Sequence, residues 1–150
     1  MIKRKPYLLL IIAAVLLLIA GFIVFGASTI VFNVHDTYYV IANSHLSWLL
    51  AMILASLSLI YWTLEKAKVG VVPVLSKIHV YGTLLFVIGF FFPYSLLFSS
   101  SESREFPFFD DIQYVNLCLT VNALLFLFLQ FLFIINIFVS IIKKLRNSAT

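Results

Sequence analysis

The residues of this sequence that could perform chemistry are concentrated in one short segment, which holds His35, Asp36, Asn43 and His45. A neutral imidazole can bind a transition metal or haem iron, or it can donate or accept a hydrogen bond. The position of His45 in the sequence is compatible with iron binding and with hydrogen bonding. His35 and Asp36 could supply two ligands to a hard cation only with help from another segment. The simpler interpretation of that pair is a helix start, with Asp36 or Thr37 capping the first turn.

Further polar side chains lie within apolar segments nearer the C-terminus. On a helix with ~100° per residue, Cys118, Asn122 and Asn136 fall within about 40° of one another, and Gln130 lies about 80° away. Such a polar stripe is typical of hydrogen bonds between membrane helices, and we favour that interpretation over a path for a substrate. His79 is predicted to be a hydrogen-bonding residue near the membrane surface, since no second metal ligand lies near it in the sequence.

The composition of the chain indicates which class of structure holds these residues. The chain has 150 residues, of which 63% are hydrophobic and 11% are charged, and its mean hydropathy is +1.13. A soluble globular domain carries about a quarter charged residues, so that class is excluded. The single cysteine excludes an internal disulfide. The formal charge of +4 comes from Lys and Arg at segment ends, which form no basic stripe. We therefore expect the lipid bilayer, and no nucleic acid, as a partner.

Four apolar segments are long enough to cross a bilayer as helices. The sequence predicts an all-α membrane protein, a single transmembrane domain over residues 1–150 with four antiparallel helices. Their expected ranges are 7–32, 37–64, 72–98 and 112–142. With the second helix starting at residue 37, His45 is expected about two turns, or ~12 Å, into that helix. The first segment follows basic residues as a secretory signal does, but it is longer than a signal core, so we expect an uncleaved helix.

The positive charges predict the orientation of the helices, because Lys and Arg are retained on the cytoplasmic side of a membrane. Nine of the ten Lys and Arg residues lie near the N-terminus, around the connector between the second and third helices, or near the C-terminus, and only Arg104 lies on the opposite side. The other two connectors hold most of the acidic residues. Both termini are therefore expected in the cytoplasm. The chain is predicted to be a multi-pass protein of an inner or plasma membrane.

The segment that carries the reactive residues resembles the signature of subunit I of the haem–copper cytochrome c oxidases, a family of the respiratory chain. The similarity is carried by the run His35-Asp36-Thr37-Tyr38-Tyr39-Val40-Ile41-Ala42-x-x-His45. It continues in Lys77-Ile78-His79 and Phe91-Phe92-Pro93. The match covers roughly the last four of the family's twelve transmembrane helices. The chain is thus similar to a truncated, degenerate member of that family.

The resemblance implies roles for individual residues. His45 matches a haem-iron ligand, and Arg104 is a candidate contact for a haem propionate. His35 and Asp36 match residues beside a magnesium or manganese site that a partner subunit completes. Asn43 stands where the family has the histidine that ligates the oxygen-binding haem, and an amide is a poor ligand for haem iron. The family's copper-binding histidines have no counterpart here. We therefore assign no catalytic residue and expect no oxygen reduction by this chain alone.

Three functions are compatible with these residues. The first is a non-catalytic subunit I-like membrane protein that packs against other membrane subunits. The second is a haem-binding or electron-transfer subunit, in which His45 ligates iron and a second copy or a partner supplies the other axial ligand. The third is one piece of a split oxidase whose other helices are encoded separately. The resemblance implies haem as a cofactor, and magnesium or manganese less strongly. The expected partners are oxidase subunits or a second copy of the chain.

Overall fold

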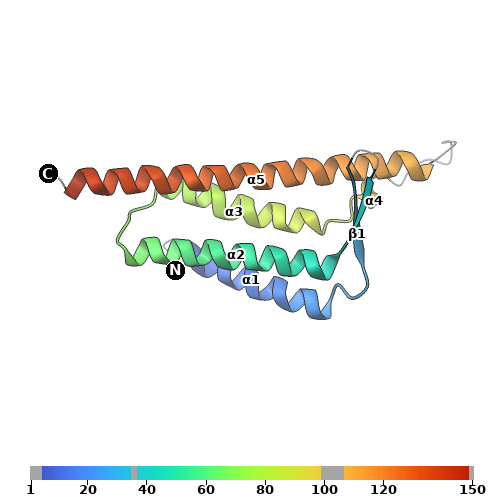
Figure 1. Ribbon diagram of the computed structural model, residues 1–150, viewed down its shortest axis with the longest axis horizontal. Coiled ribbons are helices and arrows are strands. Elements are labelled where there is room, and N and C mark those ends of the chain that lie inside the picture. The colour runs from blue at the N-terminus through green and yellow to red at the C-terminus, as the bar shows by residue number, and fades with distance from the viewer. Residues whose placement is uncertain (1–4, 35–36, 99–106, 149–150) are drawn as a thin grey trace.

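The computed structural model describes residues 5–34, 37–98 and 107–148. Its helices are α1 (Pro6–Ile23), α2 (Asn43–Lys66), α3 (Pro73–Phe90), the short α4 (Ser95–Phe98) and α5 (Pro107–Ser148), and its strands are β1 (Thr29–Val34) and β2 (Thr37–Ala42). The long helices lie lengthwise beside one another, and the two strands stand at one end of them (Figure 1). Among the described residues, four helices are long and apolar enough to cross a membrane: α1, α2, α3 and the Gln113–Asn147 part of α5. The number of long apolar helices therefore agrees with the sequence-based prediction.

A two-stranded antiparallel sheet connects α1 to α2, where the sequence predicts two helices joined by a short connector at residues 33–36. The strands pair from Thr29 opposite Ala42 to Val34 opposite Thr37. The prediction that the first helix extends to residue 32 is therefore wrong, as is the helical start at residue 37. The described residues are mainly helical, as the all-α prediction requires, and the hairpin is an addition to that fold. Both strands are rich in β-branched and aromatic residues, which favour extended backbone but count as apolar in a hydropathy profile.

The start of α2 is set by Ala42, which is still extended, with φ −63° and ψ 131°. The helix therefore begins at Asn43. Thr37 is the first residue of β2 and the N-cap of α2 is Ala42, so the prediction that Thr37 caps this helix is wrong, and Asp36 lies outside the described residues. Because residues 37–42 are extended and paired with β1, they cannot also form the first turns of a helix.

The remaining helices also differ from their predicted ranges. α3 ends at Phe90 instead of residue 98, and the chain turns before α4, because Pro93 disfavours helical backbone at the preceding residue. α5 is longer than the predicted range 112–142 and starts with a proline, which is favourable at the first helical position. Its 42 residues at ~1.5 Å each give about 63 Å, roughly twice the hydrocarbon thickness of a bilayer. Figure 1 shows α5 extending beyond its neighbours at both ends.

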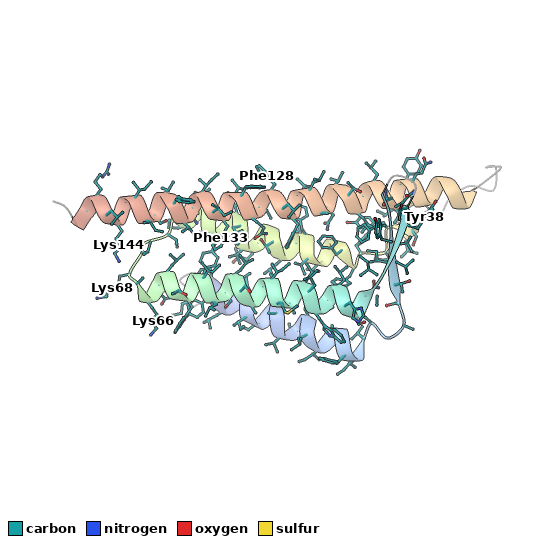
Figure 2. The ribbon with its side chains drawn as sticks, viewed as in Figure 1. Tyr38, Lys66, Lys68, Phe128, Phe133 and Lys144 are labelled. Atoms are coloured by element: carbon teal, nitrogen blue, oxygen red, sulfur yellow. The ribbon has the colours of Figure 1, made fainter. Side chains whose placement is uncertain are left out.

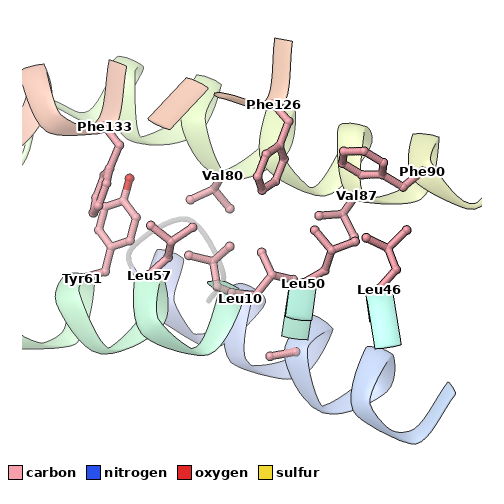
Figure 3. Packing of buried hydrophobic residues seen from close by; sticks show 12 residues of the cluster. Leu10, Leu46, Leu50, Leu57, Tyr61, Val80, Val87, Phe90, Phe126 and Phe133 are labelled. Carbon is pink, nitrogen blue, oxygen red and sulfur yellow. The ribbon is translucent and has the colours of Figure 1, made fainter. Parts of the chain in front are cut away.

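The hydrophobic core lies between two pairs of helices, α1 with α2 and α3 with α5. In Figure 3, Leu50 and Leu57 of α2 lie on one side of this core, and Val80, Val87 and Phe126 lie on the other. All five side chains are buried. The apolar faces that the helices turn toward each other thus hold the two pairs together.

Side-chain hydroxyl groups fix α1 along α2. Ser47 Oγ donates a hydrogen bond to the carbonyl oxygen of Leu17 over 2.6 Å, and Ser58 Oγ donates to that of Tyr7 over 2.9 Å. Such bonds between membrane helices contribute about 0.6 kcal/mol each on average. Their main effect is to set which residues of the two helices lie side by side.

Two glycines allow the paired helices to approach closely. A Cβ atom at Gly21 of α1 would collide with the indole of Trp48 in α2. A Cβ atom at Gly89 of α3 would collide with the side-chain amide of Asn122 in α5. Small residues at these positions are typical of membrane helix pairs, because dispersion contacts replace the hydrophobic effect as the driving force in lipid.

Candidate functional site

His45, the predicted haem ligand, lies in the first turn of α2. Its side chain is exposed, and its ring centroid lies 5.4 Å from that of Trp48. The prediction that His45 lies ~12 Å inside the helix is wrong, because β2 occupies the residues expected to form the first two turns. An exposed imidazole is accessible to iron. A haem bound there would lie on the outer surface of α2, and a partner molecule would have to supply its other contacts.

The other three predicted site residues, His35, Asp36 and Arg104, lie outside the described residues. The structure therefore does not place the predicted magnesium or manganese site or the predicted propionate contact. In the part of the chain that the structure describes, no group of three His, Cys, Asp or Glu side chains is arranged to hold a metal ion.

Asn43, at the position that matches a haem ligand of the oxidase family, makes contacts within the chain. Its Nδ2 donates a hydrogen bond to Ser28 Oγ over 3.1 Å, and its backbone N–H donates to the carbonyl oxygen of Ser28 over 2.9 Å. These bonds join the start of α2 to the turn before β1. Residues two apart on a helix do not face each other, so Asn43 and His45 point in different directions.

A second histidine, His79 of α3, lies in a buried cluster with side chains of α2 and α5. Its Nδ1 lies 3.0 Å from the Tyr61 hydroxyl, and its Nε2 lies 3.2 Å from Gln130 Oε1. The ring of Phe133 stacks on the imidazole with centroids 4.5 Å apart. Because Gln130 Nε2 donates to the carbonyl oxygen of Phe126, Oε1 is the atom that accepts from His79. The neutral imidazole therefore carries its proton on Nε2 and accepts a hydrogen bond from Tyr61 at Nδ1.

This cluster satisfies both ring nitrogens of His79 and links three helices. The hydrogen-bonding role predicted for His79 is confirmed, although its side chain is fully buried between helices. Sequence reasoning missed Tyr61 as the partner, because tyrosines near the ends of membrane helices usually mark the bilayer boundary. Tyr61 and His79 belong to different helices, so no periodicity within one segment relates them.

The predicted polar stripe of α5 bonds to α3 and to the residue before it. Asn122 Nδ2 donates to the carbonyl oxygen of Phe86 over 3.0 Å. Asn136 Nδ2 donates to Ser76 Oγ over 2.9 Å, and its Oδ1 accepts from the backbone N–H of Val72 over 3.0 Å. Interhelical hydrogen bonding is therefore confirmed for these asparagines. Each bond satisfies a polar group that would be costly to leave unpaired in lipid.

A further polar contact, which sequence reasoning missed, holds the β hairpin against α5. The N–H of Asn33 donates to Asn116 Oδ1, and Asn116 Nδ2 donates to the carbonyl oxygen of Asn33, each over 2.9 Å. One side chain thus satisfies both backbone groups of a strand residue. The signal that could have identified Asn116 is an amide side chain in an apolar helix, away from the stripe formed by the other polar residues.

The candidate residues therefore form two separate groups. His45 is exposed at the end of α2 nearest the hairpin, where it can ligate iron or form a hydrogen bond with a partner. Tyr61, His79 and Gln130 are hydrogen-bonded to one another inside the bundle and link its helices. Comparisons of this chain with protein-family models, with curated proteins and with solved structures find no match.

Proposed function

We propose that this chain is a non-catalytic integral membrane subunit, similar to the last four helices of haem–copper oxidase subunit I, which packs against another membrane protein. The four long apolar helices support its location in a bilayer. The run from His35 to His45 supports the resemblance. The bond between Asn43 and Ser28 supports a non-catalytic role, because the side chain at the position of the haem ligand is an amide that bonds within the fold.

In this proposal the four helices are antiparallel and both termini face the cytoplasm of an inner or plasma membrane. The bond between Ser58, in the second half of α2, and Tyr7, at the start of α1, supports an antiparallel pair. Lys144 Nζ donates to the carbonyl oxygen of Ala67 over 2.6 Å, which supports placing the α2–α3 connector and the C-terminal part of α5 on one side. The lysines in both places favour the cytoplasmic side.

The observation that carries the partner proposal is an apolar face of the hairpin, which we call the hairpin surface and which consists of Val31, Tyr38 and Val40. Val31 pairs directly with Val40, and Tyr38 is two residues away, so the three side chains share one face. They are 42%, 55% and 65% exposed. The hairpin lies at the end of the helices (Figure 1), and exposed apolar groups beyond the hydrocarbon layer mark interaction sites.

The hairpin surface is also held in a fixed position. A two-stranded hairpin is marginally stable on its own in water. Here the two bonds between Asn33 and Asn116 attach it to α5, and the bond of Asn43 to Ser28 closes its base. A partner that binds this surface would therefore not have to order it first, which reduces the entropic cost of binding.

Photo-crosslinking in native membranes tests the partner proposal. A benzophenone amino acid is placed at Tyr38, on the hairpin surface, or at Tyr39, which is 53% exposed on the opposite face. A third position, Phe128 of α5, is 58% exposed among the apolar side chains of that helix and reports the background from lipid and random collision (Figure 2). We expect a discrete protein adduct at Tyr38 that is weaker at Tyr39 and missing at Phe128. Adducts that are equal at all three positions, or only lipid adducts at Tyr38, would contradict the proposal.

A second candidate function is haem binding through His45, and the exposure of its imidazole favours it. The other axial ligand would come from a second copy or from a partner subunit. The absorption spectrum of protein purified from native membranes tests this candidate. A Soret band that is lost in His45→Ala and retained in His79→Gln would support it. The absence of a Soret band, or a band unchanged in His45→Ala, would remove it.

A further inference from the structure

Three lysines gather where the α2–α3 connector meets the last turns of α5. They line a cavity of about 400 Å³ whose lining residues are Lys68, Gly70, Ser140, Lys143, Lys144 and Asn147. The lysine side chains are exposed, whereas Ser140 is buried. Figure 2 shows Lys68 and Lys144 at the same end of the bundle. Because ammonium groups are cationic donors and cannot accept hydrogen bonds, this cavity suits an anion.

The backbone conformation of Lys68 gives a second indication that its side chain has a role. Its φ is 53°, in the left-handed region. The N–H of Lys68 bonds to the carbonyl oxygen of Glu65, and the N–H of Val69 bonds to that of Leu64, which is the usual hydrogen-bonding pattern of a helix end. Glycine is strongly preferred at this position, because other residues are strained there. A lysine at a position that favours glycine indicates that the side chain contributes something that offsets the strain.

An apolar cavity adjoins the basic one. It has a volume of about 370 Å³ and shares Gly70 as a lining residue with the basic cavity. Its lining is mainly apolar and includes Leu9, Val71 and Val80. Its lining also includes Glu65 and Lys77, whose opposite charges balance, so the apolar cavity carries little net charge. A Cβ atom at Gly70 would meet nothing within 4 Å, so the space beside this residue is open.

We propose that the two cavities together bind one anionic phospholipid. Its phosphate diester lies among Lys68, Lys143 and Lys144, and part of an acyl chain enters the apolar cavity. The lysines lie at the ends of helices that are long and apolar enough to cross a membrane, and basic pockets between such helices suit lipid headgroups. Lysines that only set the orientation of the chain need neither a cavity nor a strained backbone. This proposal depends on the location in a bilayer, and it is independent of the hairpin surface and of haem.

Native mass spectrometry of the full chain in detergent tests the lipid site. The protein is titrated with dioleoyl phosphatidylglycerol, which is anionic, or with dioleoyl phosphatidylcholine, which is zwitterionic and has the same acyl chains. Lys68→Gly and Lys143→Gln each remove one charge from the cavity. The matched control is Lys66→Gln, because Lys66 carries the same charge but its Nζ lies 5.8 Å from the centre of the Trp62 ring. Gly70→Leu adds a bulky side chain at the residue that lines both cavities, without changing the charge.

We expect phosphatidylglycerol to bind more tightly than phosphatidylcholine and its affinity to fall about fivefold for each cavity lysine removed. Lys66→Gln should leave the affinity within about twofold of that of the unsubstituted chain, since a lysine outside the cavity acts only through screened charge. Gly70→Leu should weaken the binding of both lipids and leave the preference for phosphatidylglycerol in place, because it obstructs the acyl-chain cavity while the three lysines remain. Equal binding of the two lipids, or an equal loss in Lys66→Gln, would overturn the proposal. Competition by soluble glycerol phosphate at the same concentration as the lipid would also overturn it, because the cavity would then be a site for a free anion.

Discussion

The hydroxyl group of Tyr61 in α2 donates a hydrogen bond to Nδ1 of His79 in α3 over 3.0 Å. Both side chains are buried, and Nε2 of the same imidazole continues the link to Gln130 of α5. The bond therefore crosses the boundary between the α1–α2 pair and the α3–α5 pair. Dispersion contacts between the apolar side chains hold these pairs together with little directional preference, whereas this hydrogen bond specifies which residues face each other.

Removal of the Tyr61 hydroxyl should weaken the joint between the two helix pairs. In Tyr61→Phe the ring remains but Nδ1 of His79 loses its donor, so we expect the free energy of unfolding to fall by about 0.5–1.5 kcal/mol. Unfolding by dodecyl sulfate in mixed micelles, followed by circular dichroism, measures this change. The control is Tyr81→Phe, since Tyr81 is 57% exposed on α3. A Tyr61→Phe protein that is as stable as the Tyr81→Phe protein would show that the buried bond contributes nothing.

The close approach of α3 and α5 should depend on Gly89. In Gly89→Ala the new methyl group would collide with the amide of Asn122, so either the helices move apart or the asparagine gives up its bond to Phe86. We expect a loss of about 1–3 kcal/mol in the free energy of unfolding, as in other overpacked sites. The same substitution at Gly70 meets no atom within 4 Å and should leave stability unchanged or slightly higher. Similar effects at both glycines would contradict the packing described here.

The hairpin should lose its fixed position when Asn116 is changed. In Asn116→Ala both bonds to the backbone of Asn33 are lost. We expect the backbone amides of β1 and β2 to exchange hydrogen about tenfold faster, which corresponds to roughly 1.4 kcal/mol of local stability. Hydrogen exchange with mass spectrometry measures this rate. Thr120→Ala is the control, because the Thr120 hydroxyl bonds only within its own helix, to the carbonyl oxygen of Asn116. If both variants exchange alike, the hairpin is held by other contacts.

Substitution by glycine should change the free energy of unfolding in opposite directions at Lys68 and at Lys66. Lys68 has a φ of 53°, so Lys68→Gly relieves strain and should raise the free energy of unfolding by about 1 kcal/mol. Lys66 is the last residue of α2, where Lys66→Gly should lower it by roughly 0.5–1 kcal/mol through loss of helix propensity. Thermal unfolding of both variants in one detergent gives the comparison. Destabilisation by Lys68→Gly would mean that its side chain supports the fold, contrary to the strain argument.

Much of the helical framework could be predicted from the sequence. The four long apolar segments are visible because the free energy of transfer into lipid depends on the local composition of a segment. The asparagines of α5 were recognisable as interhelical hydrogen-bonding residues because their angular positions follow from the period of one helix. The hairpin was not predictable by the same means, since Thr29–Val34 and Thr37–Ala42 are as apolar as a helix would be. Because α2 starts at Asn43 instead of residue 37, His45 lies in its first turn, where its side chain is exposed.

The amino-acid sequence alone was enough to predict four long apolar helices and the shared face of the polar residues of α5. The bond between Tyr61 and His79, the contact of Asn116 with Asn33, and the cavity that Lys68 shares with Lys143 and Lys144 became evident from the folded chain. This difference arises from the range of the interactions. Hydropathy and helical period depend on residues that are close in the sequence. These bonds and cavities join residues that are far apart in the sequence and meet only when separate segments pack, so no local sequence pattern predicts them.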